Sequence, residues 1–140
     1  MQGIIVKSVS APGDKGVGIA TDGRTVWTAD FTTDTIYQID RKGNVLKTIP
    51  FLLVENAGLA IERSVIWISA INPDTIYLLS AEGDTIKSFA APALFPSALS
   101  IYGKYLLVGD FAANRIYLID RKGIVVRQSA ATFPAIASIA

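Results

Sequence analysis

Residues 18–46 read GIATDGRTVWTADFTTDTIYQIDRKGNVL, and this pattern returns twice more along the chain of 140 residues. A tyrosine between apolar residues marks each copy, at Tyr37, Tyr77 and Tyr117, so the period is 40 residues. The same step joins Gly3, Gly43, Gly83 and Gly123, then Trp27, Trp67 and Leu107, and then Gly18, Gly58 and Ala98. No insertion interrupts the series, which predicts an array of three complete repeats.

Each repeat predicts four short strands. The apolar runs are short and rich in β-branched and aromatic residues, and Gly, Asp or Asn separates them. In the first repeat the strands are expected at Val17–Thr21, Thr25–Ala29, Thr35–Asp40 and Val45–Ile49. A four-residue turn ending in Gly43 follows the third strand, as a hairpin requires. Four antiparallel strands in about 40 residues are typical of one blade of a β-propeller.

The predicted fold class is therefore all-β, with three four-stranded antiparallel blades. Residues 1–140 form one partial propeller domain, with blades at about 16–50, 56–90 and 96–129. The fourth strand of each blade is the most polar, so we expect it to be outermost. Residues 3–9 match a fourth strand and residues 133–139 match a first strand, which predicts one extra strand at each end.

Composition excludes several classes of function. The net charge of +1 offers no basic face for nucleic acid or for an anionic membrane. The absence of Cys and His removes thiolate chemistry, disulfides and the commonest general base and metal ligand. No apolar run approaches the roughly 18 residues of a membrane span, and no signal peptide is recognisable. These features favour a cytoplasmic location, although they do not determine the compartment.

The stretch of residues 18–46 resembles an NHL-type repeat, and more loosely the blades of the gluconolactonase-like and streptogramin-lyase-like propellers. The resemblance implies a propeller but no single chemistry, because these families share blades and differ in activity. Streptogramin-type lyases depend on histidine, which this chain lacks. Gluconolactonase-like enzymes hold a divalent cation with carboxylates and an Asn around the channel, and no position here matches those ligands.

Candidate ligand or metal residues lie where the second strand ends and the next turn begins. They are Asp30, Asn72, Asp110 and Asn114, with Glu55 and Asn56 as additions. One interpretation is a ring of oxygen ligands for Ca²⁺ or Mg²⁺. The other, which we favour, is that each Asp accepts hydrogen bonds from the backbone of its own turn. On that interpretation no cofactor is expected.

Other conspicuous residues favour structural roles. Trp27 and Trp67 could stack on a flat ligand, but the third repeat has Leu107 there, which favours core packing. The pairs at 41–42 and 121–122 are Arg-Lys and could grip a phosphate, but the middle repeat reads Ala-Glu, which favours solvated hairpin tips. The periodic tyrosines are expected between blades, and no catalytic residue is predicted.

Two functions remain after these exclusions. The first, which we prefer, is a non-catalytic binding or scaffold module for a protein or small-molecule ligand. The alternative is a metal-dependent hydrolase or lactonase of the gluconolactonase-like type. Three blades leave two apolar flanks, since propellers close with about four to eight. We therefore expect self-association, as a homodimer of about six blades whose extra terminal strands cross the seam. The alternatives are a larger ring and a truncated array, in which the terminal strands are remnants of further blades.

Overall fold

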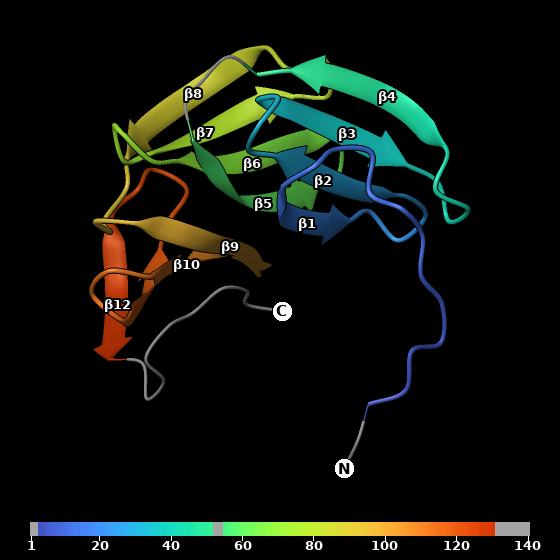
Figure 1. Cartoon of the computed structure of the whole chain (residues 1–140). Helices are drawn as coiled ribbons and strands as arrows, with labels where there is room; N and C mark the ends of the chain where they lie inside the picture. The colour runs from blue at the N-terminus through green and yellow to red at the C-terminus, as the bar shows by residue number, and fades with distance from the viewer. Residues whose placement is uncertain (1–2, 52–54, 131–140) are drawn as a thin grey trace.

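A computed structural model describes residues 3–51 and 55–130 of the chain. These residues form three four-stranded antiparallel sheets, as the repeats predict (Figure 1). Blade 1 contains β1 (Gly16–Thr21), β2 (Val26–Asp30), β3 (Thr35–Ile39) and β4 (Val45–Pro50); blade 2 contains β5 (Asn56–Glu62), β6 (Val65–Ala70), β7 (Thr75–Ser80) and β8 (Thr85–Ala90); blade 3 contains β9 (Pro96–Tyr102), β10 (Tyr105–Asp110), β11 (Arg115–Ile119) and β12 (Val125–Ala130). Across the described ranges there is no helix, and so none that could cross a membrane.

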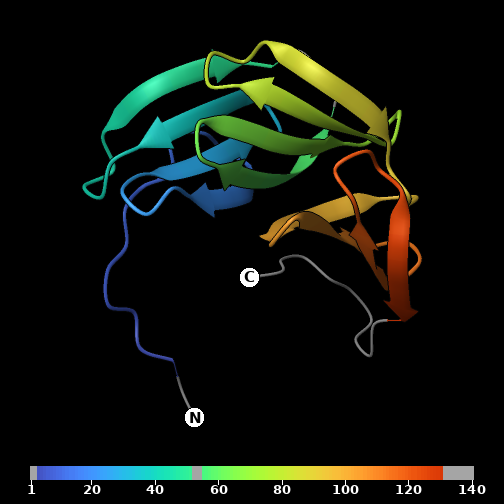
Figure 2. The same cartoon turned by 180° about the vertical axis from the view of Figure 1, so that it is seen from behind.

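The three sheets follow one another around an open arc (Figure 2). Each sheet keeps the chain order of its strands. The first strands, β1, β5 and β9, lie next to one another on the inside of the arc, whereas β4, β8 and β12 form its outside. The expected outermost position of the fourth strand is therefore confirmed.

The turns between third and fourth strands follow the predicted chemistry. Gly43, Gly83 and Gly123 have φ of 92°, 96° and 91°, a region that favours glycine. In the first turn the Asp40 carboxylate accepts hydrogen bonds from the Lys42 and Asn44 backbone N–H groups at 2.8 and 2.9 Å. These hydrogen bonds, with one from the Asn44 side chain as the largest, lower the pKa of Asp40.

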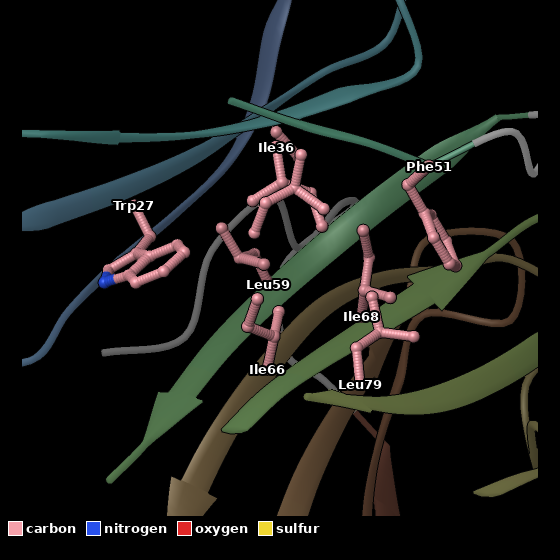
Figure 3. Close-up of a cluster of buried hydrophobic side chains, with 9 residues drawn as sticks. Trp27, Ile36, Phe51, Leu59, Ile66, Ile68 and Leu79 are labelled. Carbon is pink, nitrogen blue, oxygen red and sulfur yellow. The ribbon is translucent and has the colours of Figure 1, made fainter. Parts of the chain in front are cut away.

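A first apolar core fills the seam between blades 1 and 2 (Figure 3). From blade 1 and the residue after it come Trp27, Ala29, Ile36, Ile49 and Phe51; from blade 2 come Leu59, Ile66, Ile68 and Leu79. The Phe51 and Tyr77 rings meet edge to face with centroids 5.6 Å apart. Tyr77 therefore packs between blades, as its periodic position indicates.

A second core fills the seam between blades 2 and 3. Trp67 and Ile76 from blade 2 pack there with Leu99, Leu106 and Val108 from blade 3. Only 1% of Trp67 is exposed, so the predicted core role of this tryptophan is confirmed. Burying large apolar side chains between sheets supplies most of the stabilisation that holds neighbouring blades together.

Glycine sets the distance between neighbouring first strands. A Cβ on Gly18 would come within 2.8 Å of the Leu59 Cβ, and one on Gly58 within 3.0 Å of the Leu99 Cβ. No side chain fits at these positions without moving the next blade outward. The third repeat has Ala98 at the equivalent position.

The outer strands are joined to the next blade by a repeated pair of contacts. Lys47 Nζ donates a hydrogen bond to the Ala81 carbonyl at 2.7 Å, and Lys87 Nζ donates to the Arg121 carbonyl. Ile49 lies against Gly83, and Phe89 lies against Gly123 in the same way. Each seam is thus closed at its outer end by side chains and turns.

The two predicted terminal strands have different outcomes. Residues 3–9 form no strand in the structure. A strand requires a neighbour to complete its backbone hydrogen bonds, and a fourth strand would need the third strand of a preceding blade. The strand predicted at residues 133–139 lies outside the described residues.

Candidate functional site

Asp30 ends β2 and joins two loops of blade 1. Its side chain is 1% exposed. Its Oδ2 accepts a hydrogen bond from the Lys15 backbone N–H at 2.8 Å, just before β1. Its Oδ1 accepts from the Thr32 and Thr33 N–H groups at 2.9 and 2.8 Å and from the Thr33 hydroxyl at 3.0 Å. Both carboxylate oxygens of Asp30 therefore accept hydrogen bonds from the surrounding backbone.

Asp110 repeats this arrangement in blade 3. Its Oδ1 accepts hydrogen bonds from the Ala112 and Ala113 N–H groups at 2.9 and 3.1 Å. The loop before β9 contributes the N–H groups of Leu94 and Phe95, at 3.1 and 3.2 Å. The side chain is fully buried. The favoured interpretation of these two aspartates, in which they bind the backbone of their own turns, agrees with the geometry.

The hydrogen bonds around Asp30 favour its ionised form. Burial alone would raise the pKa of this carboxyl. The backbone N–H groups of Lys15, Thr33 and Thr32, with the Thr33 hydroxyl, outweigh burial and lower the pKa below its usual value. Asp30 is therefore a charged, buried anchor at neutral pH.

Blade 2 lacks this aspartate and uses a serine nearby. Ala70 occupies the position equivalent to Asp30. The buried Ser69 Oγ accepts a hydrogen bond from the Gly58 N–H at 2.8 Å and donates one to the Pro96 carbonyl at 2.7 Å. The hydroxyl thus connects blade 2 with the first residue of blade 3.

The amide candidates lie in the turns that follow. Asn72 is exposed in the turn of blade 2, with φ of 62°, and Asn114 directly precedes β11, with φ of 55°. The Oδ1 atoms of Asn114 and Asp74 are buried without a hydrogen-bond partner among the described residues. Such atoms in native proteins usually bind water.

These candidates do not form one cluster. Asp110 and Asn114 lie in one turn of blade 3, whereas Asp30 and Asn72 lie in blades 1 and 2. The Glu55 carbonyl accepts the Ile71 N–H at 2.9 Å, and the Asn56 side chain lies outside the described residues. Over residues 3–51 and 55–130, no three Asp or Glu side chains converge as a metal site would require. A ligand role for these residues stays a prediction.

An ion pair beside Trp67 is the main polar feature that the repeat pattern did not predict. Arg121 donates two hydrogen bonds to the Glu62 carboxylate, one of 2.8 Å from Nη2 to Oε1. Its guanidinium also lies over the Trp67 ring, 5.7 Å from the centroid, and Lys87 Nζ lies 5.5 Å from the same centroid. The hydrogen bond from Arg121 is the largest cause of a lowered pKa of Glu62.

Arg121 is therefore more than the solvated hairpin tip that the sequence favoured. It also donates to the Gly103 and Lys104 carbonyls of its own blade at 2.9 and 3.0 Å, which holds the guanidinium in place, and its bonds to Glu62 link blade 3 to blade 2. A hollow of about 620 Å³ lies beside it, lined also by Arg63 and Val65. The sequence feature that could have indicated this ion pair is Glu62, because the equivalent positions in the other repeats are Asp22 and Tyr102.

A second hollow lies on the outer face of blade 1. Its volume is about 540 Å³. The wall from the blade is formed by Ile19, Val26, Thr28, Ile39, Asp40 and Arg41, and the N-terminal residues 7–12 form the opposite wall. This face points away from blade 2, because the opposite face carries the side chains of the first core.

Solved structures share this arrangement of sheets. Glutaminyl cyclase from Myxococcus xanthus matches with a TM-score of 0.72 and 14% identity, over 84% of this chain and 53% of that one. Virginiamycin B lyase from Staphylococcus aureus matches with a TM-score of 0.63 and 15% identity, over 84% and 42%. The chain is built of β-propeller blades. The predicted resemblance to propellers, including one of the streptogramin-lyase type, is thereby confirmed at the level of the fold.

A third match is hydrazine synthase from Kuenenia stuttgartiensis, with a TM-score of 0.70, 18% identity and coverage of 98% and 42%. The chain spans about half or less of the length of these structures. At such identities the similarity carries the propeller fold and no activity. No family model matches the sequence, and the search of curated proteins gives no match.

Proposed function

We propose that this chain is a non-catalytic binding or scaffold module whose arc of three blades is completed by a second copy of itself. The proposal includes an NHL-type ring of about six blades, the number that the resemblance implies. It also includes a cytoplasmic location. The ligand of the completed ring is a protein or small molecule that binds at the turns of one rim, where propeller ligands usually bind.

The observation that carries the proposal is the outer face of blade 1. Four positions of a blade are covered by the blade that precedes it. In blade 2, covered by blade 1, they are Leu59, Ile66, Ile68 and Leu79. In blade 3, covered by blade 2, they are Leu99, Leu106, Val108 and Ile119. Blade 1 repeats the set as Ile19, Val26, Thr28 and Ile39. Ile19 is 69% exposed, whereas Leu59 is 3% exposed. The interblade positions are therefore present without the neighbouring blade, and Ile19 is open to solvent, whereas Ile39 is buried.

The outer face of blade 3 supplies the complementary surface. Leu107, Ile116 and Leu118 occupy the positions at which Trp67, Ile76 and Leu78 of blade 2 face blade 3. All three are only partly buried. A second copy can therefore place its blade 3 against blade 1 of the first, and the same contact forms again by two-fold symmetry.

A substitution on the open face tests the proposal. Ile19→Asp places a charge in the surface that the second copy would cover, so the variant should be monomeric, because burying an unpaired charge is costly. Ile86→Asp is the control, since Ile86 is exposed on the outer strand β8, away from both flanks. Light scattering at tens of micromolar protein measures the mass. A wild-type mass of 15.0 kDa would refute the ring.

The metal-dependent hydrolase stays a prediction that the described residues do not favour. The oxygens of Asp30 and Asp110 already accept hydrogen bonds from the backbone, so a cation would compete with those bonds. Metal analysis of the purified chain is the test, and one Ca²⁺, Mg²⁺ or Mn²⁺ per chain would favour the hydrolase over the binding module.

A further inference from the structure

The N-terminal segment, residues 3–10, lies where the outer strand of a preceding blade would lie. Val9 is the residue closest to a Cβ placed on Gly43, at 3.1 Å. Ile49 has this relation to Gly83, and Phe89 has it to Gly123, each at a separation of 34 residues. The N-terminal segment thus occupies on blade 1 the place that β4 and β8 occupy on the blades that follow them.

Lys7 has the position in the N-terminal segment that Lys47 and Lys87 have in the outer strands β4 and β8. The outer strands donate from Lys47 and Lys87 to carbonyl oxygens 34 residues later. Lys7 stands 34 residues before Arg41, and both line the hollow of about 540 Å³ on blade 1. We call this hollow, with the Gly43 turn at its outer end, the outer-strand groove.

The sequence of the N-terminal segment is similar to those of the outer strands, β12 included. Residues 3–10 read GIIVKSVS, and residues 123–130, three repeats later, read GIVVRQSA. The corresponding residues before and within β4 and β8 read GNVLKTIP and GDTIKSFA; the N-terminal segment shares three apolar positions with the first, as it does with residues 123–130, and two with the second. In the proposed ring, β12 of the second copy is the outer strand that precedes blade 1. The N-terminal segment therefore has the pattern of an outer strand, with Val9 at the position of Ile49 and Phe89, where β12 has Ser129.

We infer that the outer-strand groove of blade 1 binds β12 of a second copy, and that the N-terminal segment of the same chain competes for this groove. The inference rests on the proposed ring. Outer strands meet the next blade through side chains and a glycine turn, without backbone pairing, so the segment fits the groove although it forms no strand. The groove is one site with two occupants, and only one of them fits at a time.

This competition makes ring closure depend on release of the N-terminal segment. Apparent affinity between copies falls by the fraction of chains whose groove is free. The segment's contact with the blade is small: Val9 is still 42% exposed, and Val6 is 96% exposed. Because the N-terminal segment binds the outer-strand groove weakly, it lowers the affinity between copies but does not prevent their association.

The decisive variant releases the segment in the full chain. Val9→Asp removes the apolar contact with the Gly43 turn, and Val6→Asp is the matched control on the same segment, because Val6 is almost fully exposed. We expect Val9→Asp to lower the dissociation constant for self-association by about tenfold, and Val6→Asp to leave it unchanged. Sedimentation equilibrium measures both. Weaker association of the Val9→Asp chain would mean that the N-terminal segment takes part in the contact between copies, and unchanged association would mean that it has no role there. Either result would overturn the competition.

A peptide-binding experiment tests the groove independently of the proposed ring. A fluorescent peptide of residues 122–130 should bind the Val9→Asp chain more tightly than the wild type, and an unlabelled peptide of residues 3–12 should displace it. Peptide binding without self-association of any variant would support the groove and refute the ring. Equal peptide affinity for the two chains, or no binding, would overturn the groove whatever the state of association.

Discussion

Replacement of Asp30 by asparagine or alanine distinguishes a structural anchor from a ligand residue. Asparagine keeps an oxygen for the Thr32 and Thr33 N–H groups but turns an N–H₂ group toward the Lys15 N–H, which loses its acceptor. Loss of one hydrogen bond to a buried charged group costs about 1.5–3 kcal/mol. Alanine leaves three buried backbone donors without an acceptor, so we expect about 3–5 kcal/mol of lost unfolding free energy.

The pH dependence of stability provides a second readout for Asp30. Its pKa is lower in the folded chain than its usual 3.8. The contribution of the carboxylate is therefore complete above about pH 4 and is lost as the pH falls through the lower folded value. Wild-type stability should decline over that acidic range, and Asp30→Asn should show a smaller decline.

Urea unfolding followed by tryptophan fluorescence measures these effects at pH 7 and below pH 4. Asp14→Asn is the control, since Asp14 is an exposed carboxylate in the loop that Asp30 contacts. A loss below about 1 kcal/mol for Asp30→Ala would refute the anchoring role. A chelator that lowers wild-type stability but leaves that of the variant unchanged would show that Asp30 holds a metal.

Three further substitutions test the seams by the same unfolding assay. Trp67→Ala should cost about 3–5 kcal/mol, as expected for a fully buried large aromatic residue, and should leave the ligand affinity of the folded chain unchanged. Ser69→Ala should cost about 1–3 kcal/mol, because it leaves the buried Gly58 N–H without an acceptor. Arg121→Ala should cost about 1 kcal/mol or less, since the pair with Glu62 is partly exposed, and the loss should shrink in high salt.

The features that sequence predicts here are those repeated every 40 residues. The strand expected at residues 25–29 is Val26–Asp30 in the structure, and the fourth strand expected at 45–49 is Val45–Pro50. The hydrogen bonding of Asp30 follows from the turn chemistry of aspartate after a strand. Local rules were sufficient because each blade is formed by consecutive strands.

Features that occur once could not be found in this way. The Arg121–Glu62 pair joins residues 59 apart and depends on how two blades meet, which no single repeat encodes. The N-terminal segment has the sequence of a strand but forms none, since a strand needs a partner that the described chain does not supply.

Ala98 has a consequence for the shape of a completed ring. At the inner seams, Gly18 and Gly58 allow the first strands of neighbouring blades to approach closely. At a closing seam, the methyl group of Ala98 would stand in the place of that glycine and would face Ile19 of the partner subunit. The closing seams of a two-copy ring would then be wider at the axis by roughly half an ångström to one ångström than the four inner seams. In the proposed ring, two such seams on opposite sides would hold the halves further apart and make the channel oval. Such a channel would favour a ligand with a flattened cross-section over a round one.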